Sequence, residues 1–170
     1  MPNRHPTHAL DWLLGGLLLA ITWLLYLPIG QHEFIWYDDG MYLLDNSHVN
    51  GGLGWADVGW AFSEAHAGNW HPLTWLSHAL DCELFGLRPG PHHLVSAGLH
   101  AINAALCFLL LRSASGMRWA SALCAALFAL HPLRVQSVAW ASERKDLLAG
   151  LFFFLCLLAY LRYVRRPSKR

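Results

Sequence analysis

The feature that most constrains the fold is an almost unbroken apolar run, residues 9–29, near the start of the chain. A helix of this length crosses roughly 30 Å of hydrocarbon, where the backbone must satisfy its own hydrogen bonds. Comparable runs follow at 94–111 and 147–164, and a shorter one lies at 119–130. We therefore predict one all-α membrane domain, residues 1–170, with four transmembrane helices at about 9–29, 93–111, 119–133 and 147–164. No small-x-small cleavage site ends the first run, so an uncleaved anchor is expected.

Composition excludes several classes of protein. Hydrophobic residues make up 55% of the chain and charged residues only 14%, which is not typical of a soluble domain. Four scattered cysteines give no disulfide framework. The chain has no basic patch with interleaved aromatic residues, so nucleic acid is not an expected partner.

The charges are segregated along the chain. Eight of the eleven acidic residues fall between the first and second apolar runs. If all four runs cross, eight of the twelve Lys and Arg residues share one side, among them Arg4, Arg112, Arg118 and the basic tail. The positive-inside bias makes that side, with both termini, cytoplasmic. The loops 30–91 and 134–146 would then face outward together.

The outer loop 30–91 is rich in tryptophan and contains two stretches of helical periodicity. Apolar residues recur at helical spacing over 55–65 and again over 73–85, which predicts two amphipathic helices. Such helices fit a packed cap outside the membrane. They also fit helices lying along its surface, where tryptophan is enriched.

Polar residues in the second run share one helix face, because they recur at steps of three or four: His93, Ser96, His100, Asn103 and Cys107. Polar groups at this depth are costly and normally face a bundle or a wet cavity. Plain helix–helix contact through small and hydrogen-bonding residues explains the pattern equally well.

Three groups of residues could carry chemistry. Asp38-Asp39 precedes Gly40, which suits a turn or a helix cap, but acids leaving the bilayer among aromatic residues can also become general bases. Arg144-Lys145 suits either an interfacial pair or a phosphate clamp. His92, His93 and His131 could bind a metal with one of the aspartates, although their spacing matches no metal motif.

Three segments carry a resemblance to a known family: FIWYDDGMYLLDNSHV, NWHPLTWLSHALDCELFGLRPGPHHLVSAGLHAINAALCFLL and LFALHPLRVQSVAWASERKDLLAGLFFFLCLLAYLRYV. In this order they resemble the amino-terminal membrane region of the transmembrane and tetratricopeptide-repeat proteins. Those proteins are O-mannosyltransferase-like members of the glycosyltransferase-C superfamily, with relatives among bacterial tetratricopeptide-repeat membrane proteins. The resemblance covers residues 30–164 and implies a partial glycosyltransferase-C fold within a larger protein.

The resemblance implies a transferase that moves a sugar, most simply mannose, from a polyprenyl-phosphate donor to a Ser or Thr hydroxyl of a protein acceptor. It assigns catalysis to Asp38 and Asp39, with Asp38 as the base and Asp39 orienting the acceptor or a cation. Arg144 and Lys145 would bind the donor phosphate. The remaining residues expected in the cleft are His92, His93, His100, His131 and Glu143. The identity of any metal is left unknown, and a divalent cation is left open.

The chain departs from the family pattern at two points. Gln136 stands where the family has an acid, and no period of about 34 residues marks a tetratricopeptide repeat. A non-catalytic four-helix protein that binds a lipid phosphate or a partner subunit is therefore the alternative function. The compact loops favour a bacterial inner membrane.

Overall fold

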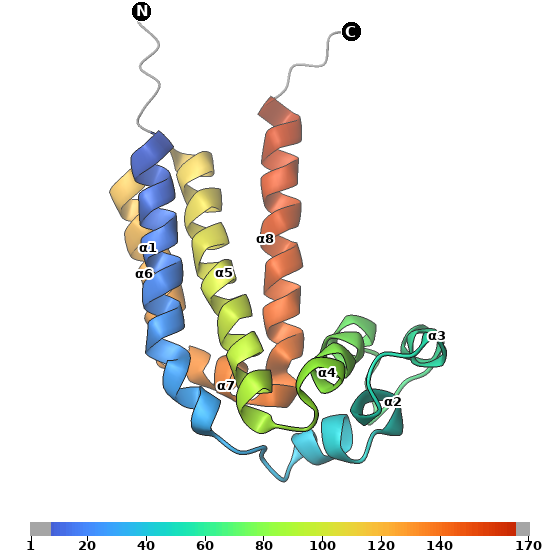
Figure 1. The fold of residues 1–170 in the computed structure, drawn as a ribbon. Helices are drawn as coiled ribbons and strands as arrows, with labels where there is room; N and C mark the ends of the chain where they lie inside the picture. Colours follow the sequence, from blue (N-terminus) through green and yellow to red (C-terminus); the bar gives the residue numbers. More distant parts are fainter. Residues whose placement is uncertain (1–7, 166–170) are drawn as a thin grey trace, which may run out of the picture.

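The computed structural model describes residues 8–165, which form helices and turns with no β-strand, as the sequence predicts (Figure 1). Four helices form the bundle: α1 (His8–Tyr26), α5 (Pro89–Ser115), α6 (Arg118–Leu130) and α8 (Arg144–Arg165). The other helices are η1 (Leu27–Gln31), η2 (Gly40–Leu44), α2 (Ser47–Asn50), α3 (Trp55–Ser63), α4 (Pro72–Phe85), α7 (Arg134–Ala139) and η3 (Ala141–Glu143).

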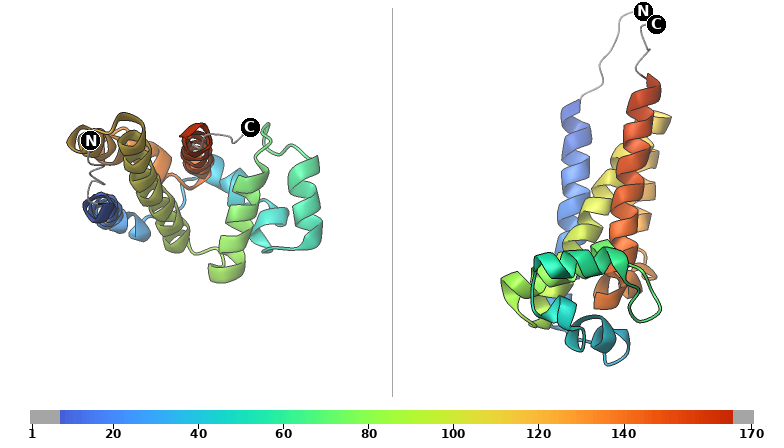
Figure 2. Two further views of the ribbon diagram at one scale, coloured as in Figure 1. Left: turned by 90° about the horizontal axis from the view of Figure 1, so that it is seen from above. Right: turned by 90° about the vertical axis from the view of Figure 1, so that its right-hand side faces the viewer.

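The four bundle helices lie side by side and alternate in direction along the chain (Figures 1 and 2). The central helix is α5, which packs against α1, α6 and α8. Its length follows from its ends, because Pro89 starts the helix where no amide donor is needed and Gly116 stops it in the left-handed conformation at φ 74°. Because the four bundle helices alternate in direction, the start of α1 and the end of α8 lie at the same end of the bundle.

Three helical segments are long and apolar enough to cross a membrane: Ala9–Gln31, Pro89–Ser115 and Ala141–Arg165. The fourth expected span, α6, has 13 residues, against the roughly 20 that a perpendicular crossing needs. It nevertheless runs antiparallel to α5 within the bundle (Figure 1). The all-helical membrane class is thus confirmed, and a count of four full spans is not.

Asp11 joins the helices at one end of the bundle. Its Oδ1 accepts from Arg112 Nε at 3.1 Å and from Arg118 Nε at 2.5 Å, on either side of the turn between α5 and α6. Three charged groups are thereby paired with one another at the end of the bundle, where they are only partly exposed. Of the other basic residues expected on this side, Arg162 and Arg165 lie in the last turn of α8, and Arg4 and those at 166–170 lie outside the described residues.

The opposite end carries a small helical unit made of η2, α2, α3 and α4 (Figure 1). The helices expected at 55–65 and 73–85 are confirmed as α3 and α4. The unit has its own hydrophobic core, built on Tyr42, Leu43, Val49, Ala61, Trp75, Cys82 and Ala141. A packed cap therefore describes this segment, while Trp36 and Trp55 remain on its exterior.

The polar face of α5 is turned inward, and all of its five predicted members are buried. His100 Nε2 donates to the Ala129 carbonyl of α6 at 2.9 Å, and Asn103 Nδ2 donates to the Leu147 carbonyl of α8 at 2.8 Å. The polar side chains thus connect neighbouring helices. His100 and Asn103 also line a cavity. The polar face of α5 therefore serves both in helix–helix contact and in lining a cavity.

Candidate functional site

Asp39 is held in the interior where the chain passes from η1 to η2. Its side chain is fully buried, and Oδ2 accepts from the Ile35 amide at 3.0 Å. Oδ1 accepts from the Ser142 amide at 2.9 Å and from the Ser142 hydroxyl. Three hydrogen-bond donors therefore converge on the Asp39 carboxylate. Asp39 consequently ties the first connecting loop to η3, immediately before α8.

Asp38 has a different environment from its neighbour. It is half-buried, and its carboxylate forms no hydrogen bond or ion pair with any residue in 8–165. The pKa of the nearby Tyr42 phenol is raised mainly by burial; the Lys145 charge lowers it, and the Asp38 charge raises it further. One carboxylate of the pair is therefore fixed by hydrogen bonds, and the other has no hydrogen-bond partner among the described residues. That difference suits the two roles predicted for them, which remain predictions.

His92 and His93 begin α5 and are both fully buried beside this loop. The Phe34 ring meets His92 edge-on at 5.4 Å and lies 6.0 Å from His93 between ring centroids. Neither ring nitrogen of His93 has a hydrogen-bond partner of good geometry within the described residues, although the Glu33 backbone interacts with the ring. Buried polar groups are normally paired, so this partly satisfied imidazole could recognise a bound group.

A cavity of about 240 Å³ opens beside Asp39. It is lined by His32, Glu33, Ile35, Val135, Gln136, Ala139 and Trp140. Ile35 is the residue whose amide binds Asp39, so the cavity and the buried carboxylate share a wall. The neutral Gln136 faces this space at the position where an acid was expected, which leaves Glu33 as the carboxylate on its lining.

Arg144 is an interior residue and not an exposed clamp. Its guanidinium is fully buried and donates to Asp81 Oδ2 at 2.5 Å, the His92 carbonyl at 2.6 Å, the Ser77 hydroxyl at 3.0 Å and the Ser96 hydroxyl at 3.2 Å. Burial raises the pKa of Asp81, and the Arg144 charge opposes that rise. A phosphate at this guanidinium would compete with Asp81 for its donors. The geometry therefore gives Arg144 a structural task that joins α4, α5 and α8.

Lys145 is the more accessible member of the pair. Its Nζ lies 2.7 Å from Glu143 Oε1 and 5.8 Å from the centre of the Tyr42 ring. The side chain is 27% exposed, so it reaches solvent while remaining paired. Lys145 pairs with Glu143 in this structure. Its role at a donor phosphate stays a prediction.

The other predicted cleft residues lie elsewhere. His131 is exposed after α6 and lines a cavity with Leu123, Leu127 and Leu130, away from those lining the Asp39 cavity. His100 lies deeper along α5 and contributes to a third cavity. Among the predicted histidines, the structure brings His92 and His93 to the Asp39 loop and leaves these two apart.

One cluster of metal-binding residue types occurs within residues 8–165, and it was not the set predicted: His78, Asp81 and His92. The Nδ1 atoms of the two histidines are 3.4 Å apart, and His92 Nδ1 is 3.6 Å from Asp81 Oδ2. Burial, together with the Arg144 charge, keeps the pKa of His78 well below its usual range. Nε2 of each histidine faces a backbone carbonyl, that of Ala141 for His78 and that of Gly86 for His92, so both neutral rings present Nδ1 as an acceptor and no hydrogen bond joins the two Nδ1 atoms. Because Arg144 already neutralises Asp81, a divalent ion here would add uncompensated buried charge, and we assign no metal to this cluster.

The sequence did not indicate three contributors to these contacts, Ser142, Asp81 and Ser77, and it indicated the fourth, Ser96, only as a member of the polar face of α5. Serine and a single aspartate on amphipathic helices carry no distinctive spacing. Their partners lie 48 to 103 residues away along the chain.

Taken together, the fold and the paired carboxylates define a helical integral membrane protein with an acidic site at one end of its bundle. The chain is 34% identical over 155 residues to protein O-mannosyl-transferase Tmtc2 of Drosophila melanogaster, a match that covers 86% of this chain and 16% of the relative. It is 33% identical to Tmtc1 of the same organism and 30% identical to human TMTC2, with 85% of this chain covered in each case.

The chain belongs to this TMTC family of protein O-mannosyl-transferases. It spans 16–18% of the length of these relatives, so the activity of the whole protein enters below as a proposal. No family model and no solved structure matches the chain.

Proposed function

We propose that this chain supplies the acidic half of the active site of a membrane O-mannosyltransferase. The enzyme would transfer mannose from a polyprenyl-phosphate donor to a Ser or Thr hydroxyl of a protein acceptor. The acceptor oxygen forms a bond to the anomeric carbon while the bond from that carbon to the phosphate oxygen breaks. The hydroxyl proton passes to Asp38, and the lipid phosphate leaves as an anion.

The observation that supports this role most strongly is the unequal treatment of the two carboxylates. Asp39 is immobilised by Ile35 and Ser142, and it fixes the backbone of its neighbour. Asp38 is thereby positioned without being paired. A general base needs this combination, because it must be fixed in place and yet have a free lone pair for the proton.

Sugar transfer to a peptide acceptor tests the assignment, measured with the full-length protein in membranes. Asp38→Asn should abolish transfer because an amide cannot take the proton. Asp39→Asn should also lower it strongly, because an amide NH₂ cannot accept from all three donors. The matched control is Asp45→Asn, an exposed acid of the same loop, which should transfer normally.

Ser142→Ala tests the positioning of Asp39 without changing Asp38, the proposed base. Asp39 would keep its two amide donors and lose only the hydroxyl, so transfer should fall by less than it does in Asp39→Asn. Normal transfer by Asp38→Asn would refute the base assignment whatever Ser142→Ala shows.

We further propose that the Asp38–Asp39 end of the bundle faces the non-cytoplasmic side, with both termini cytoplasmic, and that the membrane is a bacterial inner membrane. The paired arginines Arg112 and Arg118 at the opposite end support this orientation through the positive-inside bias. A glycosyltransferase-C arrangement of the full protein and its tetratricopeptide repeats belong to the same proposal.

A second candidate is that the chain binds a lipid phosphate or a partner subunit without turnover, and it is favoured by the burial of Arg144, whose donors bind Asp81 and its neighbours and not a leaving phosphate. Transfer activity from the purified 170-residue chain alone would exclude it.

A further inference from the structure

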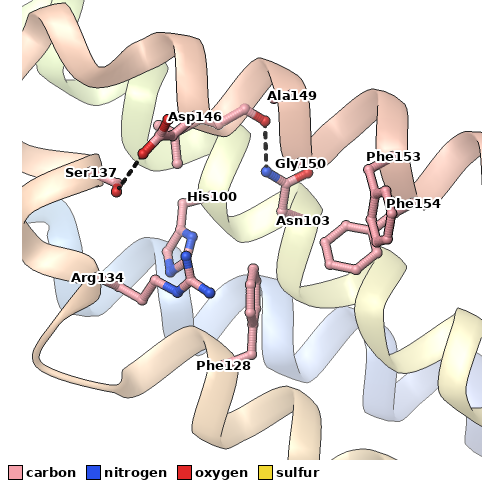
Figure 3. Close-up of a pocket in the computed structure, with 11 residues that line it drawn as sticks. His100, Asn103, Phe128, Arg134, Ser137, Asp146, Ala149, Gly150, Phe153 and Phe154 are labelled. Carbon is pink, nitrogen blue, oxygen red and sulfur yellow. Dashed lines mark hydrogen bonds between the residues drawn. The ribbon is translucent and has the colours of Figure 1, made fainter.

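A cavity of about 440 Å³ lies among α5, α6, α7 and α8 (Figure 3). One wall is apolar and is formed by Phe128, Phe153, Phe154 and Leu147. Phe153 is 59% exposed on α8, within a segment able to span a membrane. The cavity therefore has an aromatic wall that continues onto a lipid-accessible face.

The polar rim of this cavity holds a cation whose donors are unused. The side chain of Arg134, the first residue of α7, forms no hydrogen bond or ion pair with residues 8–165, and its guanidinium carbon lies 4.4 Å from the centre of the Phe128 ring. It contrasts with Arg144, whose guanidinium is saturated by Asp81 and its neighbours, and with Lys145, which is paired to Glu143. A planar guanidinium with free donors matches two phosphate oxygens.

The same cavity offers hydrogen-bond acceptors. Asn103 is 1% exposed, and its Oδ1 has no partner among the described residues although its Nδ2 is engaged with Leu147. His100 must donate from Nε2 to the Ala129 carbonyl, so Nδ1 of the neutral ring is an acceptor. Asp146 accepts from the Ser137 hydroxyl at 3.2 Å and presents a carboxylate on the rim. Acceptors of this kind suit a ligand with hydroxyl donors.

We propose that this cavity binds a lipid-linked glycosyl phosphate, with the phosphate on Arg134, sugar hydroxyls on Asn103 and Asp146, and the hydrocarbon chain along Phe153. A bare phosphate satisfies only the cation and is repelled by Asp146, whereas a sugar phosphate satisfies cation and acceptors together. Aromatic faces such as Phe128 also suit the apolar face of a sugar ring. This inference rests on the proposed function and locates the donor that it requires.

Equilibrium binding to the full-length protein in lipid nanodiscs tests the proposal. The probes are a short-chain prenyl phosphate with a mannosyl group, the same prenyl phosphate without it, phosphatidic acid and inorganic phosphate. We expect the mannosyl form to bind tightest. Arg134→Gln should weaken it by about tenfold or more, because charge-assisted hydrogen bonds to the phosphate are lost. Arg88→Gln is the matched control, an exposed arginine outside the cavity that should bind normally.

Filling the cavity gives a second variant that does not depend on charge. Ala149→Trp should block the mannosyl probe, since Ala149 lines the cavity, while Leu155→Trp on the same helix lies outside its lining and should not. Binding within twofold of wild type in both Arg134→Gln and Ala149→Trp would overturn the proposal. Equal binding of phosphatidic acid would overturn recognition of the sugar, and equal binding of inorganic phosphate would overturn both the lipid and the sugar.

The base role of Asp38 and donor binding in this cavity can be refuted independently, because the binding assay does not require turnover. Normal transfer by Asp38→Asn removes the catalytic assignment and leaves the binding result standing. Normal binding by Arg134→Gln and Ala149→Trp removes this cavity as the donor site and leaves Asp38 untouched.

Discussion

Replacing Arg144 by methionine tests whether this residue stabilises the fold or binds phosphate. Methionine keeps much of the length of the side chain and removes its charge and its donors. Asp81 would then be left buried without a cation, together with the hydroxyls of Ser77 and Ser96 and the His92 carbonyl. Breaking a buried ion pair by removing one partner costs about 3–5 kcal/mol, and we expect a loss of this order because neither partner is more than 4% exposed.

The free energy of unfolding should be measured in detergent micelles, by titration with a denaturing detergent followed through tryptophan fluorescence. The matched control is Arg162→Met, which changes the same residue type on the exposed part of α8 and should alter stability by less than about 0.5 kcal/mol. Asp81→Asn combined with Arg144→Met should lose less than the sum of the two single losses, because the pair is removed as a unit.

The pH dependence of the Arg144→Met variant follows from the same contacts. Burial raises the pKa of Asp81, and loss of the arginine would raise it further, so the folded variant binds a proton more readily than the unfolded chain. Its stability loss should therefore shrink as the pH falls through that raised pKa. A loss under about 1 kcal/mol with weakened phosphate binding would refute the structural role and restore Arg144 as a clamp.

Three further perturbations test other parts of the fold. Asp11→Asn should lower the free energy of unfolding by about 1 kcal/mol in the same titration, since its two ion pairs are only partly shielded from solvent; no loss would show that the arginine turn is held otherwise. The lowered pKa of His78 means that the unfolded chain binds the proton first, so wild-type stability should fall with acidification below about pH 6.5, and His78→Gln should flatten this slope. A cysteine at Ala65, in a cysteine-free background, should react with an impermeant thiol reagent from the non-cytoplasmic side, whereas one at Ala114 should not; both positions are exposed, and the reverse pattern would invert the proposed orientation.

Long apolar runs and helical periodicity predicted most of the fold. A hydrophobic run of about 20 residues has few alternatives to a spanning helix, and the amphipathic stretches that became α3 and α4 have the spacing of one buried face. Less was predictable for 134–146, which was expected to be a loop and contains α7 and η3. Helices of three to six residues are too short for periodicity to show.

The candidate site was predictable only where residue types were unusual. Two adjacent aspartates beside a span, and histidines opening α5, are distinctive enough to select from the sequence. The different environments of Asp38 and Asp39 were not predictable, because Asp39 is fixed by Ser142, which lies 103 residues further along the chain. The same limit explains Arg144, whose burial is decided by the packing of α4 against α8 and not by its position at a helix start.

Residues 142–146, where η3 joins the start of α8, connect the two proposed parts of the site. Ser142 holds Asp39, Arg144 holds Asp81, and Asp146 lies on the rim of the cavity that carries Arg134. Successive helical residues are about 100° apart, so Arg144 and Asp146 point to nearly opposite sides of α8. The buried ion pair of Arg144 therefore fixes the rotation of the helix for both neighbours. A change in that rotation would move the Asp39 contact and the cavity rim together, so stability at Arg144 is a condition for aligning the base with the donor.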